Sequence, residues 1–121
     1  MAESELEAEA TRLLQILCEC PFEECHALSR EFATVPPRSG VYGFRHQQEV
    51  LYIGKAVNVR QRLRGGHKAL GWAFIDRLDP DAVRVATIPL GYQAWLDALE
   101  LEARMIQKLR PRYNSIIRQS E

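Results

Sequence analysis

Apolar and charged positions near the start of the chain alternate with the period of an α-helix, which predicts an amphipathic helix over residues 3–19. Its apolar stripe consists of Leu6, Ala10, Leu13, Leu14 and Leu17. A weaker helical pattern covers residues 23–32. The proline-rich run that begins at Val35 would interrupt any regular element, so we predict an N-terminal helical extension over residues 1–35.

Two short runs of aromatic and β-branched residues follow, at residues 40–46 and 49–54. Since only a few residues separate these runs, they predict a β-hairpin. Asn58 can cap a helix that ends near Gly65, where two consecutive glycines stop it. A second short helix is predicted over residues 69–78.

The rest of the chain predicts one more strand and one long helix. Residues 82–88 form the strand, and three of its side chains share a face: Val83, Val85 and Thr87. Residues 92–109 have the longest helical period, which ends before Pro111 because proline cannot continue a helix. This order of elements predicts an α+β fold in which a three-stranded antiparallel sheet is flanked by helices.

The predicted last helix places one carboxylate on its apolar side. That side comprises Trp95, Ala98, Leu99, Met105, Ile106 and Leu109. Glu102 falls near its centre, whereas Glu100 points to the opposite, charged side. A carboxylate that faces a core is costly unless it is paired or binds a metal. The pattern leaves two explanations for Glu102: a salt bridge to an arginine, or a functional role.

Two tyrosines lie ten residues apart in the predicted hairpin, at Tyr42 and Tyr52. A turn centred on Gln47 would place them opposite each other on one face, with Cβ atoms about 5 Å apart. A turn centred between Gln47 and Gln48 would send them to opposite faces. The pattern leaves this register open, and an ordinary cross-strand aromatic pair is the alternative to a functional role.

The first short helix carries three arginines. Val59 and Leu63 define its buried side, and Arg60 and Arg62 flank that side, whereas Arg64 points further outward. One of the flanking arginines could project a guanidinium suited to forked contact with a phosphate. The helical pattern does not choose between them.

The formal net charge of zero conceals an uneven distribution. Residues 1–31 contain eight acidic side chains and two arginines, which gives −6, and the remainder carries +6. No acidic residue occurs in residues 50–75, whose cations are Lys55, Arg60, Arg62, Arg64 and Lys68. A basic patch suits a polyanionic partner, although a solvated surface is the simpler alternative.

Cys18, Cys20 and Cys25 are an odd number of thiols, which does not suit a closed disulfide framework. With His26 they supply four potential zinc ligands, but paired C-x2-C spacing is absent, so buried thiols are expected. The acidic first residues disfavour a signal peptide, and no apolar run approaches the roughly 20 residues that cross a bilayer. A soluble, cytoplasmic protein is therefore expected.

Five sequence elements in order resemble the GIY-YIG nuclease family. They are Gly40-Val41-Tyr42, Tyr52-Ile53-Gly54-Lys55, Asn58-Val59-Arg60-Gln61-Arg62, Ala98-Leu99-Glu100-Leu101-Glu102 with Ile106, and Pro111-Arg112-Tyr113-Asn114. The resemblance is closest to the amino-terminal nuclease domain of the bacterial excinuclease. It implies a GIY-YIG nuclease domain over residues 36–116, followed by a tail over residues 117–121.

The resemblance implies a metal-dependent DNA endonuclease that hydrolyses a phosphodiester bond with Mg²⁺ or Mn²⁺, in DNA repair or on structured DNA. It matches the family's metal-binding glutamate to Glu102 and its catalytic arginine to Arg62. Lys55 matches a lysine of the excinuclease-type site. Both tyrosines are expected in the active site, which favours the turn centred on Gln47. Tyr52 is the first choice to activate the attacking water, and Tyr42 is the second.

DNA contacts are expected from Arg60, Arg64, His67, Lys68 and Asn114. Relatives often carry a His or Tyr four residues after the arginine, where this chain has Gly66, so the role of His67 is open. The acidic N-terminal helix could also join a homodimer or a protein partner. The alternatives to a nuclease are a DNA-binding module that does not cleave and a protein-interaction module on the same fold.

Overall fold

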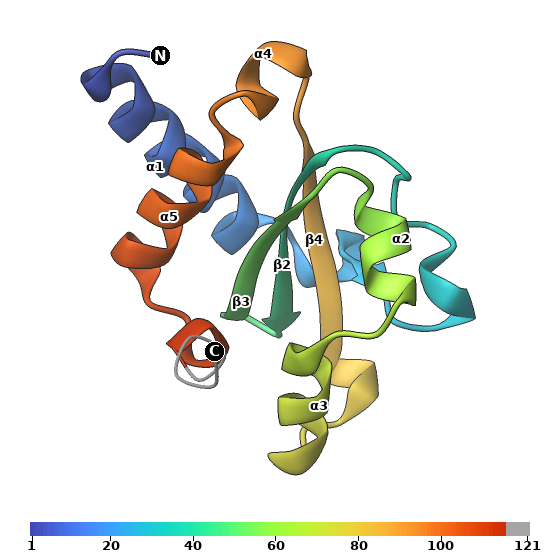
Figure 1. The fold of residues 1–121 in the computed structure, drawn as a ribbon. Coiled ribbons are helices and arrows are strands. Elements are labelled where there is room, and N and C mark those ends of the chain that lie inside the picture. Colours follow the sequence, from blue (N-terminus) through green and yellow to red (C-terminus); the bar gives the residue numbers. More distant parts are fainter. Residues whose placement is uncertain (116–121) are drawn as a thin grey trace.

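The computed structural model describes residues 1–115 and is built around a four-stranded antiparallel sheet in the order β1-β4-β2-β3 (Figure 1). Its strands are β1 (His26–Ala27), β2 (Gly40–His46), β3 (Glu49–Ala56) and β4 (Val83–Pro89). The predicted α+β fold with three main strands is confirmed, and the short β1 adds a fourth along β4. The predicted tail over residues 117–121 lies outside the described residues.

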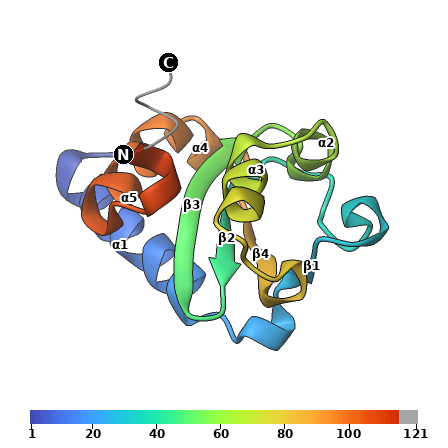
Figure 2. The same cartoon turned by 90° about the horizontal axis from the view of Figure 1, so that it is seen from below.

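Helices cover both faces of this sheet (Figure 2). The helices are α1 (Glu3–Glu19), α2 (Val59–Arg64), α3 (Lys68–Ile75), α4 (Tyr92–Trp95) and α5 (Ala98–Leu109). Three short 3₁₀ turns connect other elements, at η1 (Phe22–Glu24), η2 (Arg30–Phe32) and η3 (Pro80–Ala82). Over residues 1–115, none of the helices combines the length and the apolar character that crossing a bilayer would require.

The sheet separates two hydrophobic cores. The α5-side core lies under α1 and α5 and includes Leu13, Leu17, Val41, Ile53, Leu101 and Met105. The α2-side core lies under α2 and α3 and includes Tyr42, Phe44, Leu51, Leu63, Val85 and Tyr113. Alternation along β2 explains the division, because successive side chains of a strand point to opposite faces. The α2-side core therefore receives both aromatic residues of β2.

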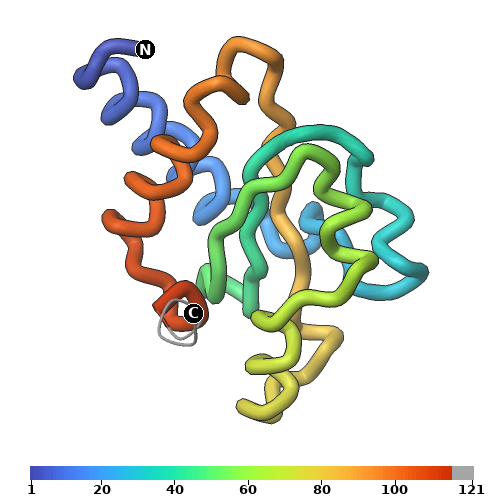
Figure 3. The backbone as a smooth tube through the Cα atoms, in the orientation of Figure 1, coloured from blue at the N-terminus to red at the C-terminus, as the bar shows by residue number. Residues whose placement is uncertain are grey.

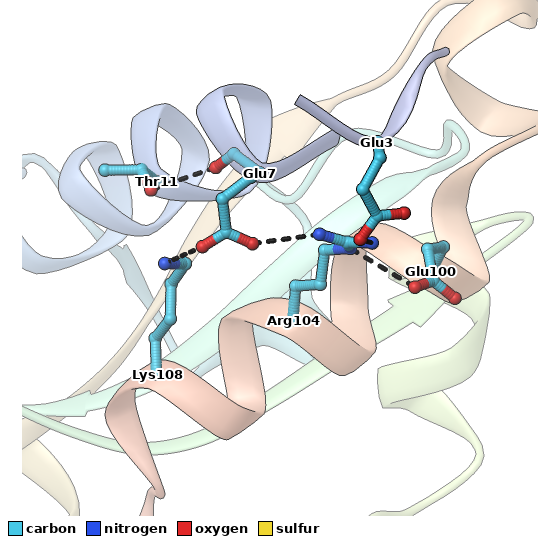
Figure 4. A network of polar contacts seen from close by, with 6 residues as sticks. All are labelled: Glu3, Glu7, Thr11, Glu100, Arg104 and Lys108. Atoms are coloured by element: carbon cyan, nitrogen blue, oxygen red, sulfur yellow. Dashed lines mark hydrogen bonds and ion pairs between the residues drawn. The ribbon is translucent and has the colours of Figure 1, made fainter. Parts of the chain in front are cut away.

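The predicted first helix is confirmed and lies beside α5 (Figure 3), and its Glu3 and Glu7 face that helix (Figure 4). Arg104 of α5 lies 2.5 Å from a carboxylate oxygen of Glu3, 2.9 Å from Glu7 and 3.2 Å from Glu100. Lys108 forms a further ion pair with Glu7. These donors lower the pKa of the Glu7 carboxyl, Lys108 first and Arg104 second. Glu3 and Glu7 of α1 thus form ion pairs with cations of α5 in the same chain.

Removal of residues 1–34 is expected to lower the melting temperature strongly, because it exposes the apolar surface that Leu13 and Leu17 cover. Circular dichroism melting of the full chain and of residues 35–121 would measure the loss. The matched control is the full-length pair Glu3→Gln and Glu7→Gln, which keeps the apolar stripe and removes exposed ion pairs of small value. Equal melting temperatures for the full and truncated chains would contradict a core role for α1.

The weak helical pattern over residues 23–32 was a wrong prediction. The segment forms η1, β1 and η2 instead, and Arg30, Glu31 and Phe32 have φ angles of 57°, 54° and 59°. Three consecutive left-handed residues are strained unless their surroundings hold them. Two arginines of α2 stabilise this turn through hydrogen bonds to backbone carbonyls. Arg64 Nε donates to the Glu31 carbonyl at 2.8 Å, and Arg60 donates to the carbonyls of Ala33 and Val35 at 3.0 and 2.7 Å.

The predicted single helix over residues 92–109 is also corrected, since α4 and α5 are separated at Leu96 and Asp97. The buried side of α5 consists of Ala98, Leu101, Met105 and Ile106. Leu99 is 70% exposed, contrary to the predicted apolar face. Glu102 is half-buried and lies on the buried side, between Ala98 and Ile106 around the helix axis.

Candidate active site

The β2–β3 hairpin brings the two tyrosines to one face by a route that differs from the predicted register. The strands join through Gln47 and Gln48, and His46 pairs with Glu49. A bulge then shifts the pairing, so that Tyr42 lies opposite Gly54 and Tyr52 lies opposite Phe44. The turn centred on Gln47 was therefore wrong, but the predicted shared face is found, with ring centroids 6.2 Å apart.

The absence of a side chain at Gly54 makes room for the Tyr42 ring over the edge strand β3. A Cβ atom at Gly54 would lie 2.6 Å from both Cζ and Oη of Tyr42, and 2.9 Å from Cε1 of Tyr52. Any side chain would displace the Tyr42 ring, which is only 1% exposed. The glycine of the second motif thus has a steric role in holding the phenol in place.

His67 completes an aromatic cluster with Tyr42, Phe44 and Tyr52. Its ring centroid lies 5.9, 4.9 and 4.6 Å from theirs, in edge-on orientations. His67 Nε2 lies 3.0 Å from the Tyr42 hydroxyl oxygen, and its Nδ1 accepts the backbone N–H of Ala69 at 3.0 Å, which caps α3. The predicted direct DNA contact is replaced by this position inside the site, since both ring nitrogens are engaged.

These two hydrogen bonds define the tautomer of His67. Because Nδ1 accepts the Ala69 N–H, the proton of the neutral ring resides on Nε2. Nε2–H therefore donates to the Tyr42 hydroxyl. Burial first, and the charge of Arg62 second, lower the pKa of His67 to about 4, so the ring is neutral at pH 7. His67 is thus a neutral donor that orients Tyr42.

Stability should fall as the pH drops from about 6.5 towards 4. The unfolded chain binds a proton at His67 below its ordinary pKa, whereas the folded chain resists protonation until about pH 4. The stabilisation is therefore complete above pH 6.5 and is lost on acidification. Melting temperatures of the wild type and His67→Asn at pH 7 and pH 5 measure the effect, and Asn retains the capping chemistry. An equal loss in both proteins would show that His67 does not carry it.

Arg62 and Glu102 both act electrostatically on Tyr42. Burial raises the pKa of Tyr42 most, and Tyr52 and Glu102 raise it further, whereas Arg62 lowers it. Arg62 is exposed, and its Nη1 donates to the Gly66 carbonyl at 2.8 Å. A cation of α2 and a carboxylate of α5 thus act on the same phenol.

Lys55 lies on the other face of the sheet from Tyr52. It pairs with Val41 of the α5-side core, and its ammonium lies over the Trp95 ring, 5.6 Å from the centroid. Proximity in sequence does not place it beside the phenol, because neighbouring side chains in a strand alternate. Its catalytic role stays a prediction, and Arg62 is the cation that acts on Tyr42.

Asn114 binds the edge strand rather than facing solvent. Its side-chain oxygen accepts the Ile53 N–H and its amide donates to the Ile53 carbonyl, each at 2.9 Å, and the residue is 6% exposed. The amide is therefore used to hold β3 beside the site, which replaces the predicted DNA contact in our interpretation. Lys68 is exposed, and its DNA contact stays a prediction.

The site fits a cation held by one carboxylate. Within residues 1–115, no group of three or more His, Cys, Asp or Glu side chains is arranged to hold a metal, and this includes the cysteine segment considered for zinc. Mg²⁺ typically uses few protein carboxylates and keeps several waters, which suits the half-buried Glu102.

Known proteins are similar to this chain in sequence and in fold. Residues 38–115 match the UvrC-like GIY-YIG domain. The chain is 34% identical over 88 residues to the UvrABC system protein C of Fervidobacterium nodosum, and 37% identical over 93 residues to that of Pelodictyon phaeoclathratiforme. These alignments cover 72% and 73% of the chain, but only 15% and 14% of the two relatives.

A solved structure is similar over nearly the whole chain. It is the GIY-YIG N-terminal endonuclease domain of UvrC from Thermotoga maritima, a point mutant bound to its catalytic divalent cation. It is 26% identical with a TM-score of 0.50, and the match covers 93% of this chain and 97% of that one. Fold and site together define a domain of the GIY-YIG endonuclease class. Within that class, the chain belongs to the UvrC-like GIY-YIG domain family.

Proposed function

We propose that the chain is a divalent-metal-dependent DNA endonuclease that hydrolyses a phosphodiester bond during DNA repair or the processing of structured DNA. The observation that supports it best is the convergence of Tyr42, His67 and Arg62 with the charge of Glu102. Its substrate is DNA, and membership of the UvrC-like family favours damaged DNA as the target. A cytoplasmic location agrees with this function.

Glu102 would hold Mg²⁺ or Mn²⁺ through a carboxylate oxygen, with water as the remaining ligands. The bound cation supplies charge stabilisation to the leaving oxygen and to the phosphoryl group. Arg62 would contact the scissile phosphate. Its exposed guanidinium already acts electrostatically on Tyr42, and its planar geometry matches phosphate oxygens.

Tyr52 would orient the attacking water and, in its ionised form, accept its proton. Tyr52 is half-exposed, whereas Tyr42 is buried and its pKa is raised by that burial, which disfavours Tyr42 as a base. Tyr42 would instead fix the cluster, since it accepts a hydrogen bond from His67 and its ring contacts that of Tyr52. A homodimer through α1 is not part of the proposal, because the apolar side of α1 packs within the chain and its Glu3 and Glu7 pair with Arg104.

A cleavage assay on supercoiled plasmid and on branched or damaged duplexes tests the proposal. Cleavage is expected with Mg²⁺ or Mn²⁺ and should stop with EDTA. Tyr52→Phe should reduce it about 10²-fold or more, because the water loses its proton acceptor. The matched control is Tyr92→Phe, which alters an exposed tyrosine of α4 and should keep wild-type activity.

Metal-independent binding without cleavage on every substrate would favour the alternative of a non-cleaving DNA-binding module. Absence of both binding and cleavage in a folded protein would contradict the proposal altogether.

A further inference from the structure

The end of α1 and the start of β1 bring two cysteines into contact outside the proposed site. Cys25 Sγ lies 3.8 Å from Cys20 Sγ, with the Cys25 thiol as donor. Both thiols also approach the Pro21 carbonyl oxygen, Cys25 at 3.5 Å and Cys20 at 3.7 Å. Cys25 is buried and Cys20 is half-exposed, so a small reagent would reach Cys20 first.

A fully buried guanidinium borders this pair. Arg45 is 0% exposed, and its Nη1 donates to the carbonyls of Leu17 and Cys20 at 2.8 and 2.9 Å. Its Nη2 is buried without a hydrogen-bond partner in residues 1–115. Its positive charge acts on the Cys25 thiol and opposes a bound cation there.

Cys25 keeps its proton at neutral pH. Burial first, and the contact with Cys20 second, raise the pKa of Cys25 to about 11, although Arg45 opposes the rise. Cys20 is the more exposed sulfur, and the high pKa of Cys25 makes that thiol the weaker nucleophile, so Cys20 is the thiol that reacts first. The two thiols thus have different roles before any reaction.

We propose that Cys20 and Cys25 are a redox modification site, which a hydroperoxide converts into an intramolecular disulfide. The proposal is independent of the nuclease function. The Cys20 thiolate attacks the outer oxygen of the hydroperoxide, and the O–O bond breaks. The leaving alkoxide takes up the proton that Cys20 released, which gives an alcohol and a sulfenic acid at Cys20.

The Cys25 sulfur then attacks the sulfenic sulfur of Cys20, and the oxygen departs as water with the Cys25 proton. Two thiols are oxidised and one hydroperoxide is reduced. A disulfide needs the sulfurs about 2.05 Å apart, so the pair must close by nearly 2 Å. The mainly exposed turn at η1 lies between the two cysteines and can absorb that movement.

The test treats the full-length protein with hydrogen peroxide and maps its peptides without reduction. We expect two thiols to disappear per chain, a Cys20–Cys25 linked peptide that dithiothreitol reverses, and a melting temperature about 5 °C higher. Cys20→Ser and Cys25→Ser should each prevent the link. If Cys25→Ser fails to fold, Cys20→Ser still tests the proposal, because it keeps the buried thiol of Cys25. Cys18→Ser is the matched control and should form the link like the wild type.

The following results would overturn the proposal. They are a disulfide that uses Cys18 or joins two chains, thiols that survive excess peroxide, and stoichiometric Zn²⁺ binding that requires Cys20 and Cys25. Sulfinic acid at Cys20 in place of the link would also overturn it, because Cys25 would then be too far away to react.

Discussion

Glu102→Gln is expected to abolish cleavage, by about 10³-fold or more, at saturating Mg²⁺. Glutamine keeps the shape of the side chain but removes the negative charge that a hard cation requires. DNA binding should persist or tighten, because one negative charge leaves the site. Single-turnover cleavage and thermal melting on the same sample would measure the effect.

Glu100→Gln is the matched control, since Glu100 lies two residues away, is exposed and pairs only at the surface with Arg104. It should keep both activity and stability. A Glu102→Gln protein that is active but less stable would identify Glu102 as a structural ion-pair partner and would contradict the metal assignment.

Arg62→Ala is expected to reduce the single-turnover rate by about 10²–10³-fold, since a preorganised charge at the phosphate acts mainly in the transition state. The matched control is Arg64→Ala, another exposed arginine of the same helix. It should leave the chemical step unchanged and weaken DNA binding modestly, in a salt-dependent way. Rates at saturating DNA separate the two effects.

Arg60→Ala should lower the melting temperature more than Arg64→Ala does, because Arg60 donates to two carbonyls beside the left-handed turn, those of Ala33 and Val35, and Arg64 donates to one, that of Glu31. If Arg62→Ala and Arg64→Ala slow the chemical step equally, neither arginine has the assigned catalytic role.

Sequence periodicity predicted the elements whose burial follows a regular repeat. The apolar stripe of α1, the strands of the hairpin and the Asn58 cap of α2 are all found. It failed at local departures from regularity, because no repeat reports a bulge, a left-handed turn or a break between helices. The bulge changed the partner of Tyr42 from Tyr52 to Gly54 and still left both phenols on one face.

The candidate site was predicted unevenly. The motifs singled out Glu102 and Arg62, and the helical count placed Glu102 on the buried side of α5, although it also wrongly placed Leu99 there. The place of His67 depends on a tertiary contact with Tyr42 that its sequence position does not express. Buried Arg45 was missed, although its alternation with Val41 on β2 was a signal that it points into the α5-side core.

The bonds of Asn114 have a consequence for solubility. Strand β3 is the outer strand of the sheet, and the Ile53 N–H and carbonyl point away from β2, where another extended chain could pair with them. Exposed strand edges of this kind are templates for aggregation. The Asn114 amide occupies both groups and so acts as a cap that an incoming strand would have to displace. Loss of that cap would therefore favour self-association along β3.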